Sequence, residues 1–377
     1  MKMKKMFKIG LCMIAGVVLN ALPAIAGEMS SDGTLKELNE MKSRIERLES
    51  SEINDIEKDW MEKISISGLI EVEAGHASMK YKDSETPNAK NSDITLATVE
   101  LGIDAEINKH VSGHVLLLWE EDDTEPVDLD EGYITLSGED VLPLYLSAGK
   151  MYVPFGSFNS HFISDPITLE IGETRESAIR AGFANDLFDI SISIFNGDIE
   201  KISGDDRVKS WVANAIFTLP EDAVSGFGLS LGASYISNIA ESDGLEGEVL
   251  AGAINDYVSG VGYFLNASVK ERFFIGFEYV GARERFAPGD LSFDNGLAYK
   301  PRAYNLEFAW AANDDLLMGI KYGKTKELGD LLPERQYGCV LTYGLFKYTT
   351  VGIEYLSGKY ENGDKSNLFT AQLAVEF

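Results

Sequence analysis

The segment LFTAQLAVEF, residues 368–377, alternates strictly between two kinds of side chain. One face of an extended chain would carry Phe369, Ala371, Leu373, Val375 and Phe377. The other face would carry Thr370, Gln372, Ala374 and Glu376. A period of two with one apolar face predicts a β-strand with one side in an apolar phase and the other in water. An ordinary sandwich strand at the end of a chain is the alternative.

Residues 1–26 have the three parts of a secretory signal peptide. The basic start consists of Lys2, Lys4, Lys5 and Lys8. The apolar run at 9–22 is shorter than the roughly 20 residues of a membrane-spanning helix, and it leads to the small-x-small site Ala24-Ile25-Ala26. Because Leu11 precedes Cys12 where a lipobox takes Gly or Ala, we expect an exported chain that starts at Gly27 and carries no lipid anchor.

Aromatic residues and glycines are plentiful, with 16 Tyr, 19 Phe and 36 Gly in the chain. Strand-like runs recur to the end, and no later segment has the composition of a membrane-spanning helix. An exported, strand-rich, aromatic chain fits a β-barrel in the outer membrane of a Gram-negative bacterium. A chain ending on an aromatic residue resembles the closing strand of such barrels, in which the last Phe, here Phe377, is part of the assembly signal. Cys339 is the single cysteine after the signal, so no internal disulfide is expected.

Residues 27–61 follow a different period. Leu38, Met41, Ile45 and Leu48 are spaced three, four and three residues apart, and Lys, Glu and Arg fill the gaps. This spacing predicts an amphipathic helix and favours a short coiled coil. About four heptads are marginal as a free peptide, but an oligomeric barrel would hold several copies together. A lone helix packed on the barrel mouth is the alternative.

Period-two alternation starts at Ile64 and recurs about sixteen times, an even number as bacterial barrels require. We predict strands at 64–76, 94–107, 111–120, 128–137, 143–152, 177–184, 187–196, 208–219, 226–238, 255–268, 271–284, 301–312, 314–325, 335–345, 347–357 and 367–377. Short connections alternate with long ones, as periplasmic turns and external loops do. The expected fold is therefore all-β: a transmembrane antiparallel barrel over residues 62–377, preceded by the helical segment on the periplasmic side.

The charge balance is strongly acidic. The chain has 33 Lys plus Arg against 61 Asp plus Glu, and its net charge is −28. Removal of the signal takes away four lysines and no acids, which leaves 29 − 61 = −32. Nucleic acid is therefore not an expected partner, and an aqueous lumen should concentrate cations. In the alternative, most acids lie on surface loops and hold divalent cations against lipopolysaccharide.

The long connection at 153–176, the third external loop, is expected to be the longest. In general porins the third loop folds into the lumen and sets its narrowest point. The candidate constriction residues on this loop and the next strand are His161, Asp165, Glu170, Glu173, Arg175, Glu176 and Arg180. Facing acids and bases in a narrow aqueous passage select permeants by charge and shape. A loop that lies over the mouth and binds nothing is the alternative.

Further charges fall on the polar face of predicted strands and should point into the lumen. They are Glu71, Glu73, Glu100, Asp104, Glu106, Glu120, Glu278, Glu307, Lys321 and Glu354. Acids outnumber bases in this set. A polar lumen needs such residues to hold water, so each one is more readily a wall residue than a ligand contact.

Signals for an enzyme, a metal or a cofactor are absent from the sequence. The spacing of His110 and His114 crosses a turn into a strand and does not lie on one helix face, so a metal site is not expected. There is no phosphate-binding loop and no dinucleotide fingerprint. Ser–His pairs can be drawn as in outer-membrane phospholipases, but no motif supports one. We therefore expect no enzyme and no cofactor.

The order of segments resembles the LbtU-type siderophore porins. The periplasmic helix ELNEMKSRIERLE is followed by the opening strand ISGLIEVE, and AGKMYVPFG leads into FISDPITLEIGETRE before the final Phe. The resemblance covers nearly all of the chain after the signal, and 149–176 is its most specific part. It implies a 16-strand barrel with a coiled-coil extension that passes a ferric siderophore without a plug domain.

We therefore expect a porin for passive diffusion of small hydrophilic solutes, homotrimeric, in contact with lipid and lipopolysaccharide, and inserted by the outer-membrane assembly machinery. Siderophore uptake is the specialisation that the resemblance implies. Carboxylate siderophores are anionic, so their passage would require the cations at 161, 175, 180 and 321 to cluster in the lumen. A general cation-selective porin and a structural tether to the cell wall are the alternatives.

Overall fold

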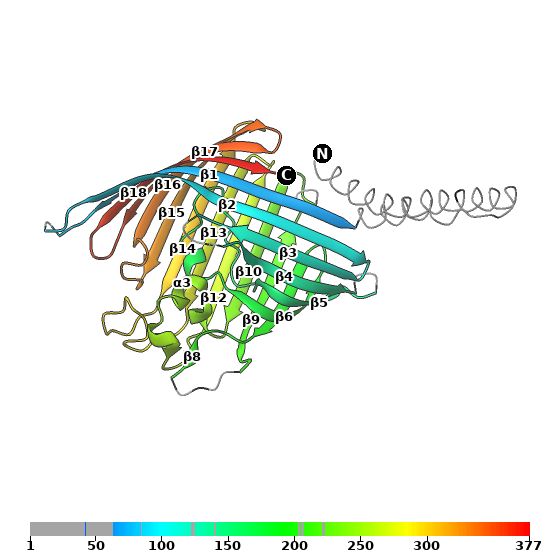
Figure 1. Ribbon diagram of the computed structural model, residues 1–377, viewed down its shortest axis with the longest axis horizontal. Coiled ribbons are helices and arrows are strands. Elements are labelled where there is room, and N and C mark those ends of the chain that lie inside the picture. Colours follow the sequence, from blue (N-terminus) through cyan, green and yellow to red (C-terminus); the bar gives the residue numbers. More distant parts are fainter. Residues whose placement is uncertain are drawn as a thin grey trace, which may run out of the picture. The chain divides into compact units, whose positions relative to one another are not determined.

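Sixteen antiparallel strands close into a barrel between residues 64 and 376 (Figure 1). The computed structural model describes Lys42 and residues 63–377, apart from 84, 122, 123, 125, 139, 140, 203, 205, 206, 221 and 222. Lys42 is helical. The predicted signal peptide and the predicted coiled-coil positions Leu38, Met41, Ile45 and Leu48 lie outside the described residues, so the coiled coil stays a prediction.

The barrel strands follow the predicted ranges closely. Their bounds are β1 Ile64–Lys80, β2 Ala89–Asn108, β3 Val111–Trp119, β4 Asp128–Ser137, β5 Leu144–Tyr152, β6 Arg175–Ala184, β7 Phe188–Phe195, β9 Ser210–Leu219, β10 Phe227–Ile236, β12 Gly260–Val269, β13 Phe273–Ala282, β14 Arg302–Ala311, β15 Leu316–Lys326, β16 Arg335–Phe346, β17 Thr349–Lys359 and β18 Lys365–Glu376. The prediction of sixteen antiparallel barrel strands is thus confirmed.

The last strand closes the barrel against the first, and Figure 1 shows β18 in red beside β1 in blue. Phe377 extends this pairing past the end of β18. Gly68 N donates to Phe377 O at 2.8 Å, and Phe377 N donates to Gly68 O at 3.0 Å. A Cβ built on Gly68 would lie 2.4 Å from Phe377 Cζ, so this glycine makes room for the terminal ring.

The two faces of the barrel wall differ as the alternation requires. On β7, Ile190 and Ile192 are about half exposed, whereas Ser191 and Ser193 between them are buried. Exposed apolar side chains recur in the same way on most of the strands. The wall therefore has an apolar outside and a polar inside. Among the described residues, no helix is long and apolar enough to cross a membrane.

Several strand boundaries differ from the sequence prediction, and three connections change as a result. The β1–β2 connection was expected at 77–93, but both strands extend through polar residues, and only 81–88 lie between them. A backbone ladder needs no apolar face, so the alternation did not reveal this extension. β6 starts at Arg175, which makes Arg175 and Glu176 strand residues. β12 starts at Gly260, so the connection 237–259 is slightly longer than 153–174, and the third loop is not the longest.

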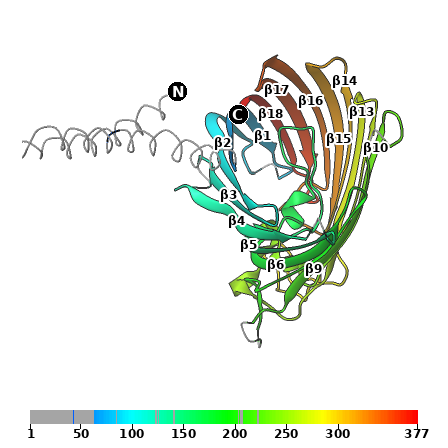
Figure 2. The same cartoon turned by 90° about the vertical axis from the view of Figure 1, so that its right-hand side faces the viewer.

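Long loops pack against one another and against the inner wall. The buried cluster includes Phe155 and Ile171 from 153–174, Leu245 from α3 (Asp243–Glu246), and Phe286 and Leu291 from 283–301. Short strands β8 (Glu200–Lys201) and β11 (Ala253–Ile254) pair in parallel and join the 196–209 loop to the loop that contains α3. In Figure 2 loop segments enter the ring of strands. The loops therefore form an apolar core of their own on one side of the barrel mouth.

Candidate functional site

The segment 153–174, called loop 3 below, is bonded to the inner wall by three carboxylates. The first is Glu278 of β13. Its Oε1 accepts hydrogen bonds from Ser157 N at 2.7 Å and from Phe158 N at 3.3 Å. Its Oε2 accepts one from Thr168 Oγ1 at 2.8 Å. One side chain thus holds both the outgoing and the returning part of the loop.

Glu307 of β14 is the second carboxylate and lies one strand further along the wall. It accepts a hydrogen bond from Ser160 Oγ at 2.8 Å and one from His161 N at 3.1 Å. Asn305 Nδ2, on the same strand, donates to Glu307 at 2.9 Å. The His161 ring lies 4.9 Å from the ring of Phe274, centroid to centroid.

Glu354 of β17 is the third. It accepts from Ile163 N at 2.9 Å and from Ser164 N at 3.2 Å, and Ser164 Oγ also donates to it. Lys321 of β15 completes the attachment, because its Nζ donates to Ser164 O at 3.1 Å and lies 4.5 Å from the centre of the Phe162 ring. Loop 3 therefore follows the inside of the wall from β13 to β17.

These attachments are of a strong kind. Hydrogen bonds to an ionised carboxylate are roughly twice as strong as neutral ones. Glu278, Glu307 and Glu354 are 6%, 3% and 1% exposed, and Lys321 is 4% exposed. A buried group that loses such a partner keeps its full desolvation cost. The three acids and the lysine therefore fix the position of loop 3, and they do not line a water column as simple wall residues would.

Inward-facing glycines give the loop its space on the same wall. A Cβ on Gly319 would lie 3.3 Å from the Phe162 ring, and one on Gly338 would lie 3.0 Å from it. A Cβ on Gly352 would lie 3.1 Å from Ile163 Cδ1. Sequence reasoning did not single out these residues. Their signal was glycine at the polar-face positions of three consecutive strands, where a lumen wall would otherwise carry a side chain.

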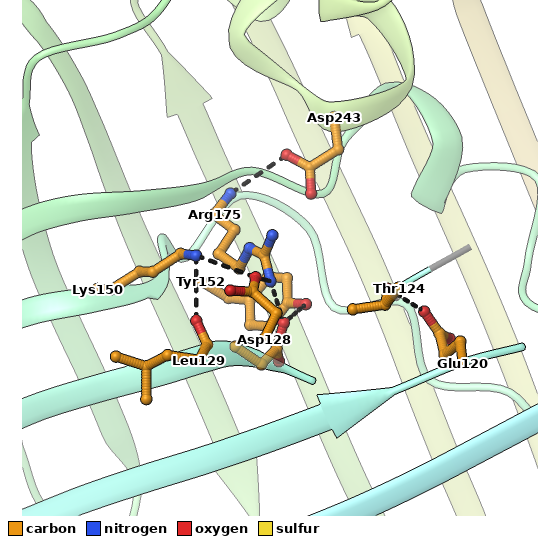
Figure 3. A network of polar contacts seen from close by, with 9 residues as sticks. Glu120, Thr124, Asp128, Leu129, Lys150, Tyr152, Arg175 and Asp243 are labelled. Carbon is orange, nitrogen blue, oxygen red and sulfur yellow. Dashed lines mark hydrogen bonds and ion pairs between the residues drawn. The ribbon is translucent and has the colours of Figure 1, made fainter. Parts of the chain in front are cut away.

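A polar network ties the start of β6 to β4 and β5, on a different part of the wall (Figure 3). Arg175 Nη1 pairs with the carboxylate of buried Asp130 and lies 3.6 Å from Asp128 Oδ2. Lys150 Nζ lies 3.5 Å from the same Asp128 oxygen, and Tyr152 OH donates to Asp130 at 3.2 Å. The charge of Arg175 is therefore already matched by acids.

Asp243 links this network to the loop that contains α3. Its Oδ1 accepts a hydrogen bond from Arg175 N at 3.4 Å, and Figure 3 shows it over the arginine backbone. Sequence reasoning found Arg175 and missed all of its partners, because they come from other strands and another loop. No spacing in the chain signals their contact.

Several acids face the lumen without a matching cation. On loop 3, the side chains of Asp165 and Glu170 are exposed and that of Glu173 is half-buried. On the wall, Glu71 and Glu73 of β1 and Glu100 of β2 are half-buried. None of these six forms an ion pair with any Lys or Arg that the structure describes. Coulombic repulsion acts between Asp165 and Glu73, so an acid of loop 3 and an acid of β1 act on each other with like charge.

Glu173 shows the electrostatic effect of this arrangement. The pKa of its carboxyl is raised to about 8, and partial removal from water is the largest cause of this rise. The negative charges of Asp243, Asp165 and Asp130 contribute to the same rise, and the positive charge of Arg175 opposes it. Burial and nearby like charges both disfavour the ionised form of a carboxyl. Glu173 is therefore a titrating group in the neutral pH range.

The remaining predicted residues are dispersed. Arg180 Nη2 lies 3.2 Å from Asp189 Oδ2, and its guanidinium lies over the Tyr145 ring. His114 Nδ1 lies 2.7 Å from Asp104 Oδ1. The side chains of Glu106, Glu120 and Glu176 take no part in binding loop 3. The structure thus unites Glu278, Glu307, Lys321 and Glu354 around the loop, while Arg175 and Arg180 pair with acids elsewhere on the wall.

Catalytic and metal chemistry finds little support in this geometry. Within the described residues, no group of three His, Cys, Asp or Glu side chains could hold a metal ion. Among the described residues, a contact between a His ring and a Ser hydroxyl joins His76 Nδ1 and Ser92 Oγ at 2.6 Å. It is exposed, and in the described part of the chain the other ring nitrogen of His76 has no acidic or amide partner. A base without an orienting group lacks the arrangement of a catalytic triad.

The fold is that of the outer-membrane porins. The barrel is similar to the outer-membrane channel DcaP of Acinetobacter baumannii, with a TM-score of 0.57 and 14% identity over 83% of this chain and 97% of that one. It is also similar to an anion-selective porin from Comamonas acidovorans, with a TM-score of 0.56 and 11% identity over 83% of this chain and 99% of that one. At such identities the likeness is one of fold alone.

The chain also has relatives in sequence, and it matches only part of their length. The chain is 28% identical over 308 residues to a UPF0422 protein of Coxiella burnetii. This alignment covers 78% of this chain and 64% of that protein. It is 27% identical over 325 residues to a UPF0422 protein of Legionella pneumophila, with 78% and 58% covered. The chain thus spans less than two thirds of these relatives. No protein-family model matches it.

Proposed function

We propose that this chain is a passive diffusion channel of a Gram-negative outer membrane and that it favours small hydrophilic cations. The closed barrel with its apolar outside supports insertion into a bilayer, because every strand edge is paired. The likeness to solved outer-membrane channels supports the same location. Short turns at the end that carries both chain termini of the barrel support a periplasmic position for the helical segment.

Loop 3 is the proposed constriction. Its backbone is bonded to the wall inside the barrel. This attachment supports a fixed constriction and speaks against a flexible loop that only covers the mouth. The exposed acids Asp165 and Glu170 extend from this fixed segment. A rigid ring of charge selects permeants of the opposite sign. His161, Glu173, Arg175, Glu176 and Arg180 belong to the same proposed passage as secondary contributors.

The observation that carries the cation preference is the imbalance of free charge. The six acids at 71, 73, 100, 165, 170 and 173 have no ion-pair partner among the described cations, whereas Arg175 pairs with Asp130 and Arg180 with Asp189. A cleft lined by charge of one sign concentrates the opposite ion. We therefore propose cations as the favoured permeants.

Ferric siderophore uptake is the specialisation that the resemblance implies. An anionic chelate would need free cations along its path. His161, Arg175, Arg180 and Lys321 do not form such a cluster, since each lies beside an acid or donates to loop 3. The charges thus favour general cation passage over a carboxylate siderophore.

The proposed channel is a homotrimer whose helices at 31–60 form a coiled coil in the periplasm, and the assembly machinery and lipopolysaccharide are proposed partners. Deletion of residues 31–60 tests this arrangement together with the rival role as a tether. A porin should keep its permeability and lose trimer stability. The tether would be supported if the full chain gave little permeability and the deletion abolished attachment to the cell wall.

The test of the proposed function is a permeation assay in liposomes that contain the purified barrel. Uptake rates of an amino-acid cation and an amino-acid anion of similar size are compared. We expect the cation to enter several-fold faster, and we expect the variant Glu73→Gln/Asp165→Asn to reduce this ratio. The variant Glu106→Gln, at a lumen acid near the short-turn end, is the matched control. Equal rates in the wild-type protein, or block by a ferric carboxylate siderophore, would contradict the proposal.

A further inference from the structure

A row of cations crosses five adjacent strands at the end of the barrel that bears the long loops. The strand register places Lys324 of β15 opposite Arg335 of β16, and Arg335 opposite Lys359 of β17. Lys359 lies opposite Lys365 of β18, and Lys365 lies opposite Lys80 of β1. We call these five residues the basic row. They are direct cross-strand partners, although acids outnumber bases in the chain by 61 to 33.

Such a row is unfavourable by itself. Like charges that lie directly opposite in an antiparallel sheet destabilise the pairing. Within the described part of the chain, Lys80, Lys324, Lys359 and Lys365 form no ion pair, and Arg335 has only the neighbouring Glu334 at 3.7 Å. A row of like charges becomes favourable when an anion outside the protein lies against it.

Nearby acids are already engaged. Glu327 pairs with Arg285 and lies 3.5 Å from Arg302. Asp364 accepts hydrogen bonds from Lys82 N at 2.7 Å and from Asn362 Nδ2 at 2.9 Å. Among the described residues, Glu334 is the one acid of these loops that forms an ion pair with the row.

The basic row lies on the outside of the barrel. On β15, Lys324 alternates with Gly323 and Thr325, both of which are buried toward the lumen. On β16 and β17, Arg335 and Lys359 share a face with the exposed rings of Tyr337 and Tyr355. Tyrosine rings below a line of cations are the pattern found at a membrane–water interface. The cations thus lie at the height of lipid headgroups.

A groove on the same face leads to the row. Its volume is about 310 Å³. The apolar and aromatic part is lined by Phe277, Leu306, Tyr304 and Tyr322, and Lys324 and Lys326 lie at its charged end. An apolar floor with cations at one end fits an amphiphile that has an acyl chain and an anionic head.

We propose that the basic row and this groove form a binding site for the phosphorylated headgroup of an outer-leaflet glycolipid. The phosphates lie against Lys324, Arg335, Lys359 and Lys365, and one acyl chain lies along Phe277 and Leu306. The external position of the row rests on the proposed outer-membrane orientation. The binding chemistry itself does not depend on whether the barrel conducts ions.

The test uses the full chain, refolded from urea into detergent without cell lipid. The row variant is Lys324→Gln/Lys359→Gln/Lys365→Gln. The control variant Lys109→Gln/Lys270→Gln/Lys347→Gln removes the same number of charges from short turns at the opposite end. Resistance of the folded form to SDS at room temperature shows that each variant is folded. Binding of bisphosphorylated lipid A and of dephosphorylated lipid A is measured by surface plasmon resonance at several salt concentrations.

We expect the wild-type and control proteins to bind bisphosphorylated lipid A with similar affinity, and the row variant to bind it at least ten-fold more weakly and with less salt dependence. Dephosphorylated lipid A should bind all three weakly. Equal affinity of the row variant, or equal binding of the two lipids, would overturn the proposal. Full displacement by millimolar inorganic phosphate would also overturn it, because the ligand would then be free phosphate. Bilayer conductance of the row variant reports on the channel separately.

Discussion

At the scale of single residues, the lumen uses its acids in two ways. Glu278, Glu307 and Glu354 are buried and accept hydrogen bonds from the backbone of loop 3. Asp165 and Glu170 remain exposed on that loop. The sequence presents all five alike, as charges on polar faces or loops. Contact with a donor, and not residue type, separates an acid that anchors the loop from an acid that stays exposed.

Replacement of Glu354 by Ala tests the anchoring role. The change leaves Ile163 N and Ser164 N without their carboxylate acceptor in a buried site, and it removes one of the acids beside Lys321. Each lost partner of a buried group costs about 1–3 kcal/mol. We expect loop 3 to become mobile and single-channel current to become noisy, while the barrel stays folded. The control is Glu106→Ala. A quiet channel of unchanged conductance in Glu354→Ala would show that this carboxylate does not hold the loop.

Titration of Glu173 gives a pH dependence. Its pKa of about 8 in the folded protein lies above the usual value near 4.3. The folded state therefore binds the proton more tightly, and stability from this group falls as pH rises from about 4 through 8. The passage gains negative charge over the upper part of that range. We expect the cation-to-anion permeability ratio to rise between about pH 7 and 9.

The variant Glu173→Gln should reduce this rise, because the amide does not ionise. Reversal potentials in a salt gradient, recorded at each pH, measure the ratio. The control variant Glu106→Gln should keep the wild-type profile. A rise of unchanged size in Glu173→Gln would assign the titration to another group.

At the scale of elements, the wall of β15–β17 is shaped to receive loop 3. A side chain at Gly338 would meet Leu356 Cδ2 at 2.6 Å and the Phe162 ring at 3.0 Å. Glycine weakens the interior of a strand, but at this position the missing side chain leaves space for the Phe162 ring. The loop and its wall are thus complementary parts of one unit.

We expect Gly338→Val to displace Phe162 and alter conductance, even though valine favours a strand. Gly75→Val on β1 is the control, since a Cβ there has no neighbouring heavy atom within 4 Å. Single-channel current and thermal unfolding of both variants provide the comparison. If Gly75→Val changes the current as strongly as Gly338→Val does, the contact of Phe162 with Gly338 has no special role.

The closing strand carries its own prediction. Deletion of Phe377 removes two backbone hydrogen bonds to Gly68 and the ring that covers this glycine. We expect less folded, heat-modifiable barrel in the membrane. Phe369→Ala, at an exposed ring on the same strand, is the matched control. Wild-type levels of folded barrel after the deletion would contradict an assembly role.

At the scale of the whole molecule, the barrel could be predicted from the sequence because apolar and polar residues alternate within each strand. The predicted and observed ranges of β4 coincide at 128–137. The attachment of loop 3 could not be predicted in this way. Ile163 N and Glu354 are 191 residues apart in sequence, and no local pattern encodes that contact. The polar partners of Arg175 were missed for the same reason.

Loop 3 is proposed to hold an acid-rich constriction inside an open barrel. The most direct measurement is the reversal potential of the purified protein in a planar bilayer under a potassium chloride gradient. We expect stable single-channel steps and a potential whose sign shows cation selectivity, with lower selectivity in Asp165→Asn/Glu170→Gln. A closed barrel, or an open one whose reversal potential is zero or anion-selective, would contradict it.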